Sequence, residues 1–222
     1  GEALASSAAV SRTELTTRRA QDEAGTRVRV HGGEIAETAP CGMPPGTTIA
    51  VRDLFYNVPA RRAFLRTPAT EFKHIVETFQ ALALSHPGVA FSLVHDGTEV
   101  YRLPAAEHLA DRVADLFGDR YRDSLVAVEE GTSYLSVRGV VGTPEVARRS
   151  RGDQYVFANG RFVKSRSLEH AAGRAFGALL PDGAYPFIAL FLDVDPRHLD
   201  VNVHPTKTEV KFDDERGVYS FV

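Results

Sequence analysis

Residues 154–165 read Gln-Tyr-Val-Phe-Ala-Asn-Gly-Arg-Phe-Val-Lys-Ser. Apolar residues on both sides of an Asn-Gly pair predict a β-hairpin with a type I′ turn, whose two central residues take positive φ. We therefore expect strands over Gln154–Ala158 and Arg161–Ser165, joined at Asn159 and Gly160. The run Phe187–Val194 is almost continuously apolar, which is typical of a central strand. Together these segments predict a sheet in the second half of the chain.

The rest of the second half supplies more strands and two helices. Helical spacing of Leu109, Val113 and Leu116 predicts a helix over Leu109–Phe117, and we expect another over Leu168–Leu180. Alternation predicts four further strands, over Leu125–Glu129, Tyr134–Val141, Val201–His204 and Glu209–Phe212.

The first half has the same mixed character. Alternating stretches predict strands over Thr13–Thr17, Thr26–Val30, Glu34–Thr38 and Thr47–Leu54. A helix is expected to begin after Thr67 as N-cap, with Pro68 at its first position. A hairpin turning at Asp96 and Gly97 follows it. With a domain boundary near 105, both halves are predicted to be α+β, a helical layer on a sheet.

Composition excludes several classes of protein. The chain has 222 residues, 43% of them hydrophobic, which is enough for real cores. No apolar run approaches the roughly 20 residues of a membrane span, and we expect no signal peptide. Cys41 is the only cysteine, so a disulfide framework within the chain is excluded and a reducing cytosol fits. The net charge of −3 leaves nucleic-acid binding to the distribution of charge.

Two segments of the first half are compatible with a nucleotide. Gly1-Glu2-Ala3-Leu4 is a glycine opening a helix of small residues, whose free N–H groups suit a phosphate. Most such helix starts bind nothing, so the residues alone leave this open. Gly46-Thr47 enters a strand after a proline-rich loop, where the pair also serves as ordinary turn chemistry.

Two longer segments are more particular. Residues 53–62 read Asp-Leu-Phe-Tyr-Asn-Val-Pro-Ala-Arg-Arg, which as a pattern is a strand end, a turn and two solvated arginines. Residues 200–210 read Asp-Val-Asn-Val-His-Pro-Thr-Lys-Thr-Glu-Val, so Lys207 follows a strand on a constrained loop. A lysine there is a point charge suited to a phosphate, although a surface lysine is the commoner finding.

In this order and at these separations, the four segments resemble the MutL family of mismatch-repair ATPases. Gly1–Leu4 is similar to the end of the family signature Gly-Phe-Arg-Gly-Glu-Ala-Leu, and residues 53–62 and His-Pro-x-Lys are similar to family motifs. The resemblance covers the whole chain. It implies the C-terminal part of a GHKL (Bergerat) ATPase sandwich over 1–105, then a domain like ribosomal protein S5 domain 2 over 106–222.

The resemblance also implies a nucleotide site for ATP and Mg²⁺. Gly1, Glu2, Ala3 and Leu4 are expected near the triphosphate, and Thr47 at the adenine end. Lys207 corresponds to the lysine that reaches the γ-phosphate, and Asn202 lies near it. The general base and magnesium-binding asparagine of the family precede the point where this sequence starts. We therefore expect no metal ligand here, and neither tight ATP binding nor hydrolysis by these 222 residues alone.

Basic residues gather in the second half, where they form either a solvated face or a binding groove. They are Arg148, Arg149, Arg151, Arg161, Lys164, Arg166 and Arg174. The resemblance implies DNA binding without strong sequence preference in this domain. Arg166 is carried over as a DNA-contacting residue, accompanied by Arg161, Lys164 and Arg149, while the Arg61-Arg62 pair offers further phosphate contacts.

For the intact protein the resemblance implies an ATP-dependent coordinator of DNA mismatch repair. It would form a homodimer on ATP binding and link a MutS-type mismatch sensor to a downstream nuclease or helicase, in the bacterial cytoplasm at the nucleoid. Two alternatives stay open. One is a DNA-binding module that needs no nucleotide. The other is the ATPase region of a type II topoisomerase, whose switch lysine usually follows Gln-Thr.

Overall fold

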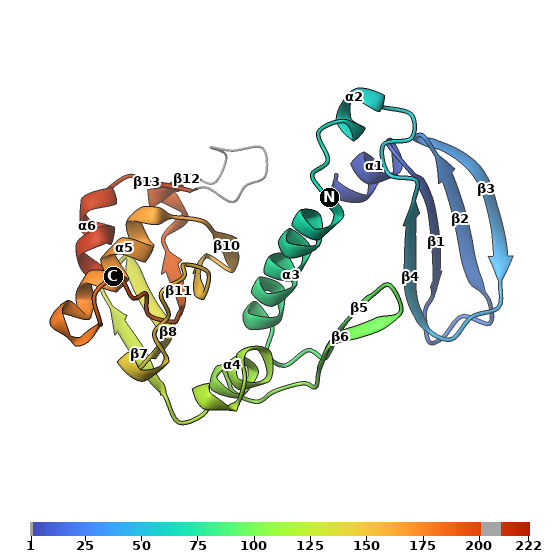
Figure 1. Cartoon of the computed structure of the whole chain (residues 1–222). Coiled ribbons are helices and arrows are strands. Elements are labelled where there is room, and N and C mark those ends of the chain that lie inside the picture. The colour runs from blue at the N-terminus through green and yellow to red at the C-terminus, as the bar shows by residue number, and fades with distance from the viewer. Residues whose placement is uncertain (1, 201–209) are drawn as a thin grey trace. The chain divides into compact units, whose positions relative to one another are not determined.

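The computed structural model describes residues 2–200 and 210–222 (Figure 1). It divides the chain into two compact units, unit 1 over Gly1–Phe72 and unit 2 over Lys73–Val222. This division lies earlier than the expected boundary near 105, and the packing of unit 2 gives the reason below. Each unit is described by itself.

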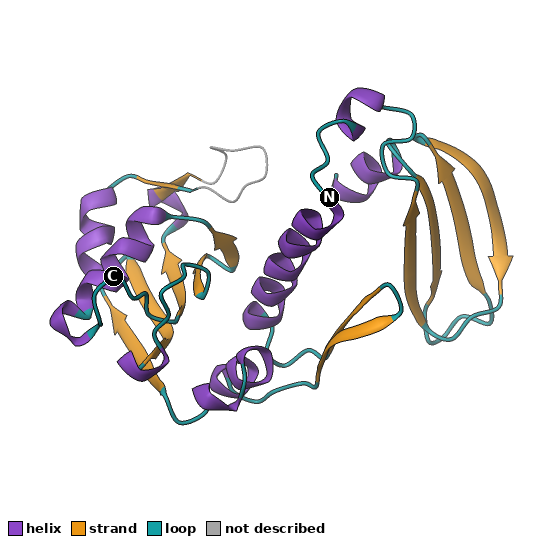
Figure 2. Cartoon of the chain, viewed as in Figure 1, coloured by secondary structure: helices purple, strands orange, loops and turns teal. Residues whose placement is uncertain are grey.

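Unit 1 is built on a four-stranded antiparallel sheet in the order β3-β2-β1-β4 (Figure 2). All four predicted strands are present: β1 is Arg12–Arg18, β2 Gly25–His31, β3 Glu34–Cys41 and β4 Gly46–Arg52. Two short helices, α1 (Ala3–Ala8) and α2 (Pro59–Arg62), lie at one end of this sheet (Figure 1). The helix α2 was not predicted, because its four residues are too few to show a helical period.

Unit 2 contains a five-stranded mixed sheet in the order β10-β9-β11-β8-β7. Its strands are β7 Leu125–Gly131, β8 Leu135–Gly142, β9 Gln154–Ala158, β10 Arg161–Val163 and β11 Ile188–Val194. The central strand β11 is parallel to β9 and antiparallel to β8. The predicted turn between β9 and β10 is confirmed, since φ is 47° at Asn159 and 76° at Gly160.

Both faces of this sheet are buried, each in its own core. Tyr155 and Phe157 point into a core shared with the helices α3 (Pro68–Ser85) and α4 (Leu109–Phe117). Their neighbours Val156 and Ala158 point into a second core with α5 (Arg166–Ala175) and α6 (Glu215–Phe221). The period of two along a strand produces this division. It also explains why β11, at the middle of the sheet, is apolar at nearly every position.

The long helix and the hairpin that precede residue 105 pack against the sheet of unit 2. The elements of this layer are α3 Pro68–Ser85, β5 Phe91–His95, β6 Thr98–Leu103 and α4 Leu109–Phe117. Leu84 of α3 and Leu103 of β6 share a core with Val113 of α4 and Tyr155 of the sheet. A hydrogen bond also joins α3 to the sheet, since the Tyr155 hydroxyl donates to Gln80 Oε1 (2.8 Å). These contacts place 73–105 in unit 2.

The later part of unit 2 differs from expectation in two places, and a third prediction there is not tested. The predicted helix Leu168–Leu180 is wrong in its bounds: α5 spans Arg166–Ala175, and Gly177, with φ of 52°, begins a separate 3₁₀ turn. The helix α6 (Glu215–Phe221) was not predicted. The predicted strand Val201–His204 lies outside the described residues. The remaining strands are β12 (Leu199–Asp200) and β13 (Lys211–Phe212). The 3₁₀ turns of the described residues are Asp119–Tyr121, Pro144–Val146, Gly177–Leu179 and Pro196–His198.

No helix in the described part of the chain is long and apolar enough to cross a membrane.

Arg112 of α4 is fully buried and fixes the connections around it. Its Nη2 donates to the carbonyl oxygens of Pro87 (2.6 Å), Val89 (2.7 Å) and Pro104 (2.7 Å). The guanidinium also lies 5.8 Å from the Phe91 ring centroid. Burial lowers the pKa of Arg112 from its ordinary value. One side chain therefore joins α4 to both ends of the β5–β6 hairpin.

We predict that Arg112→Met lowers the free energy of unfolding of unit 2 by about 2–4 kcal/mol, because three buried carbonyls lose their donor. Urea denaturation measures the loss. The control is Arg102→Met, which removes only an exposed pair with Glu99 and should change stability by less than about 1 kcal/mol. Equal effects of the two substitutions would contradict the assigned role of Arg112.

Candidate nucleotide and DNA sites

The N-terminus of α1 offers unpaired N–H groups. The first hydrogen bond inside the helix runs from the Ser6 N–H to the Glu2 carbonyl (2.9 Å), so the N–H groups of Ala3 and Leu4 have no acceptor within the helix. The side chain of Glu2 does not cap the helix. Glu2, Ala3 and Leu4 are all exposed. A phosphate at this helix start stays a prediction.

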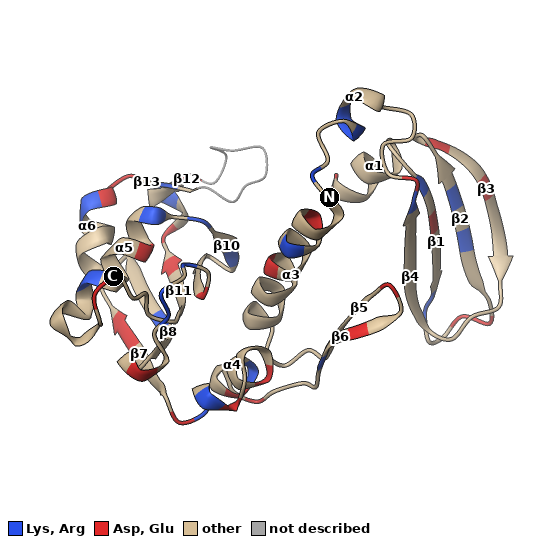
Figure 3. Ribbon diagram, in the orientation of Figure 1, with Lys and Arg blue, Asp and Glu red and all other residues tan. Residues whose placement is uncertain are grey.

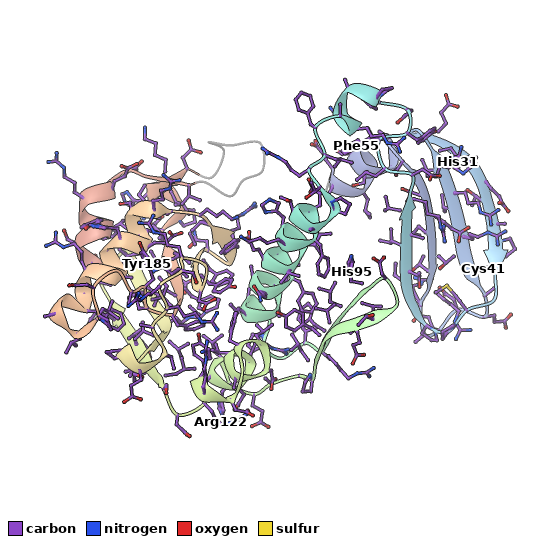
Figure 4. The ribbon with its side chains drawn as sticks, viewed as in Figure 1. His31, Cys41, Phe55, His95, Arg122 and Tyr185 are labelled. Carbon is purple, nitrogen blue, oxygen red and sulfur yellow. The ribbon has the colours of Figure 1, made fainter. Side chains whose placement is uncertain are left out.

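The segment Asp53–Asn57 holds the other end of α1, and we call it the α1 clasp. The Phe55 N–H donates to the Val10 carbonyl (2.6 Å), and Asn57 Nδ2 donates to the Ala9 carbonyl (3.0 Å). Asp53 and Phe55 reach these positions with φ of 53° and 64°, which is uncommon for residues other than glycine. Phe55 is labelled in Figure 4. The motif that carried the family resemblance therefore has a structural task.

Arg12 of β1 steadies the α1 clasp from the sheet. Its Nη1 lies 3.6 Å from the Asp53 carboxylate, and its guanidinium carbon lies 5.2 Å from the Tyr56 ring centroid. Both partners are in the clasp, so a strand residue, the turn and α1 form one connected group. The sequence pattern of residues 53–62 predicted only a strand end and turn, because no local pattern shows which distant carbonyl a turn N–H will reach.

Thr47 lies at the opposite end of the sheet from α1. It pairs with Thr17, at the far end of β1, and the two hydroxyl oxygens are 2.8 Å apart. The α1 clasp meets the near end of β1, where Arg12 pairs with Arg52. The structure therefore separates Thr47 from the C-terminal end of α1 by the length of β1.

Gly1, Asn202 and Lys207, the other predicted nucleotide contacts, lie outside the described residues. The strands that flank 201–209 are described: Leu199 pairs with Phe212, and Asp200 with Lys211. Asp195 precedes them and accepts from the Arg197 guanidinium, which holds the pKa of that carboxyl well below its usual range. The two ends of the Lys207 segment are thus fixed side by side in unit 2.

The predicted DNA-contacting residues occupy different positions in unit 2 (Figure 3). Arg166 is the first residue of α5, and the Ser165 hydroxyl caps this helix by accepting from the Leu168 N–H (3.3 Å). Lys164 Nζ lies 3.2 Å from Glu77 of α3. Arg161 opens β10 and Arg149 follows a 3₁₀ turn, and both are exposed.

Two adjoining pockets are lined by some of these basic residues. The larger, about 430 Å³, is lined by Arg151, Arg166 and Arg174 among others. The smaller, about 200 Å³, includes Lys164. The pockets share Arg151, Gln154 and Glu169, and we call them together the basic cleft. Arg161 and Arg149 line neither pocket.

The structure brings Arg151 and Arg174, two members of the basic group that the sequence identified, into the same pocket as Arg166. Arg174 lies eight residues after Arg166 on α5, so both project from one face of that helix. This spacing was visible in the sequence and could have selected Arg174. Arg151 reaches the cleft from a loop, which no periodicity reveals. Within the described part of the chain, none of Arg151, Arg166 and Arg174 forms an ion pair.

Glu169 is the acidic residue that both pockets share. Burial raises the pKa of its carboxyl, against the opposing charges of Arg151, Arg166 and Lys164. Among the described residues there is no group of three or more His, Cys, Asp or Glu side chains that could hold a metal ion. The cleft therefore combines several basic side chains with one partly buried carboxyl.

Comparison with known proteins agrees with the fold. The family model described as DNA mismatch repair protein, C-terminal domain, matches residues 113–222. This defines the second half of the chain as a domain of mismatch-repair proteins. The chain is 46% identical over 222 residues to the DNA mismatch repair protein MutL of Christiangramia forsetii, and 44% identical to that of Flavobacterium johnsoniae. The chain belongs to the MutL family.

These matches cover all of this chain but 36% and 34% of the two relatives, so the chain spans about a third of their length. Among solved structures, the Aquifex aeolicus MutL ATPase domain complexed with ADP is similar, with a TM-score of 0.71 and 29% identity. The similarity covers 88% of this chain and 72% of that one. The predicted α+β class, a GHKL part followed by an S5-like domain, is confirmed.

We predict that Asn57→Ala loosens α1. Removing the bond to the Ala9 carbonyl costs about 1 kcal/mol, so hydrogen exchange at Ser6 and Ala9 should quicken about fivefold. Asp22→Ala is the control, since it breaks a surface pair with Arg19 at the other end of β1. Unchanged exchange in α1 after Asn57→Ala would show that the side chain of Asn57 does not hold the helix.

Proposed function

We propose that the chain is the ATP- and DNA-binding part of a MutL-type coordinator of DNA mismatch repair. Membership of the family supports the general role. The observation that carries the DNA-binding part is the basic cleft, where Arg151, Arg166 and Arg174 line one pocket and have no ion-pair partner among the described residues.

Binding in the cleft would be directed at the phosphate backbone. Arginine presents a planar fork of donors that suits phosphate oxygens. Contacts of this kind fix the position of DNA and carry no sequence information. Arg166 and Lys164 are proposed as contacts within the cleft, with Arg161 and Arg149 beside it. Lys164 would first have to give up its pair with Glu77, which lies 3.2 Å away.

A nucleotide site is proposed at the start of α1. The N–H groups of Ala3 and Leu4, which have no acceptor within the helix, suit a phosphate, and the solved relative that binds ADP supports a nucleotide in this fold. Glu2 and Gly1 are proposed beside them, Thr47 at the adenine end, and Lys207 with Asn202 near the terminal phosphate. Mg²⁺ is proposed only for the intact protein, as the family implies, and no step is assigned to that ion.

For the whole protein we propose ATP hydrolysis, dimerisation on ATP binding, and contacts with a MutS-type mismatch sensor and a downstream nuclease or helicase. A cytoplasmic, nucleoid-associated location follows from that role. A lysine on unit 2 that sensed the terminal phosphate of a nucleotide on unit 1 would let ATP favour one arrangement of the two units. Because the chain belongs to the MutL family, we reject the type II topoisomerase alternative.

The second candidate is DNA binding that needs no nucleotide. The observation that supports this second candidate is that every residue of the basic cleft belongs to unit 2. Measuring DNA affinity with and without a non-hydrolysable ATP analogue separates the two. An unchanged affinity would favour the nucleotide-independent module.

We predict that Arg166→Glu weakens binding to all DNA sequences alike. The dependence of affinity on salt should also become shallower, by roughly 0.9 in the log–log slope for each duplex phosphate that the variant no longer neutralises. Fluorescence anisotropy over a range of salt concentrations measures both. The matched control is Arg216→Glu on α6, an exposed arginine that lines neither pocket. An unchanged slope and affinity for Arg166→Glu would remove Arg166 from the site.

We predict that Lys207→Ala in the whole protein lowers the rate of ATP hydrolysis by at least about tenfold, because positioning and neutralising phosphate charge account for most of this catalysis. A phosphate-release assay measures it. Lys211→Ala, in β13, is the control and should leave the rate unchanged. The same assay on these 222 residues alone checks the expectation that they are inactive. Full activity of Lys207→Ala would exclude the proposed role.

A further inference from the structure

One wall of the larger pocket is apolar, which a surface for phosphates alone does not need. Leu180, Ala184, Tyr185 and Pro186 line it. Tyr185 is labelled in Figure 4. The volume of about 430 Å³ lies in the range of pockets that hold small molecules, about 300–1,000 Å³. The pocket thus has room and an apolar surface for a group larger than a phosphate.

The same pocket carries polar groups that can meet the edge of a planar ligand. Gln154, Glu169 and His170 line it together. In the described part of the chain no residue hydrogen-bonds the side chains of Gln154 and Glu169. His170 uses Nδ1 with the Tyr219 hydroxyl (2.7 Å), and no described residue pairs with its other ring nitrogen. An amide, a carboxyl and an imidazole offer both donors and acceptors.

A positively charged side chain lies against the apolar wall. The guanidinium carbon of Arg151 lies 4.9 Å from the Tyr185 ring centroid, so the cation is held against the aromatic ring. Arg166 and Arg174 line the pocket from α5. The ligand that fits is a planar group with hydrogen-bonding edges joined to an anion. A nucleotide has this composition.

We propose that the larger pocket holds one unpaired nucleobase of single-stranded DNA, with the neighbouring phosphates on Arg151, Arg166 and Arg174. This inference rests on the DNA binding proposed above and adds a site for a base. The base must be unpaired, since stacking and pairing in a duplex cover the faces and edges that the pocket would contact. Stacking on the Tyr185 ring accepts any base, whereas hydrogen bonds from Gln154, Glu169 and His170 to the edge of the base would favour particular bases.

Gly173 provides a clean test. It lines the pocket from α5, and a Cβ built on it meets no atom within 4 Å. Gly173→Met would therefore fill the pocket while leaving the three arginines in place. Gly173→Ala is the matched control, because one methyl group leaves most of the space and alanine favours the helix.

The experiment compares three fluorescent probes of equal length at fixed salt: single-stranded DNA, the same backbone without bases, and duplex DNA. The unchanged chain should bind the base-bearing single strand roughly tenfold more tightly than the abasic one. Gly173→Met should remove that difference and leave the abasic and duplex affinities as they were. Gly173→Ala should behave like the unchanged chain.

Equal affinity for base-bearing and abasic strands would overturn the proposal, as would a difference that survives Gly173→Met. Absence of binding to every probe by the unchanged chain would instead reject the proposed DNA binding itself. An acidic peptide of the same charge is added as a further probe. If it binds as tightly as the base-bearing strand and its binding is abolished by Gly173→Met, the pocket is a peptide site and the nucleobase proposal fails.

Discussion

The buried guanidinium of Arg112 is the constraint on which unit 2 depends. It binds three main-chain carbonyls from the segments that enter and leave the β5–β6 hairpin. A charged group at zero exposure is stable only with such partners. Because α4 and the hairpin are fixed in this way, α3 is held over the sheet, where Gln80 accepts from Tyr155 and Glu77 borders the basic cleft.

The basic cleft contains arginines without ion-pair partners in the described part of a chain with a net charge of −3. Other arginines are paired locally with acidic residues, as Arg29 is with Glu14 (2.6 Å) and Arg148 with Asp153 (2.9 Å). Arg151, Arg166 and Arg174 of the larger pocket lack such partners among the described residues. Their charge is therefore available to an anion in the pocket.

The α1 clasp illustrates strain held by its surroundings. Two non-glycine residues with positive φ, Asp53 and Phe55, are uncommon so close together. Hydrogen bonds to Ala9 and Val10 and the contacts of Arg12 compensate for it. The result fixes the chain at the C-terminal end of α1.

The sequence by itself determined most of the strands, both type I′ turns and the family. These features depend on alternation, on the local φ preferences of Asn-Gly and Asp-Gly, and on the order of short motifs. Only the tertiary structure decided that residues 73–105 belong with unit 2, that Asp53–Asn57 holds α1, and that Arg151 joins Arg166 and Arg174 around a pocket. Those outcomes depend on contacts between residues far apart in the chain, such as Leu84 with the core around Tyr155. Periodicity describes neighbours within one helix or strand and contains no information on which elements meet.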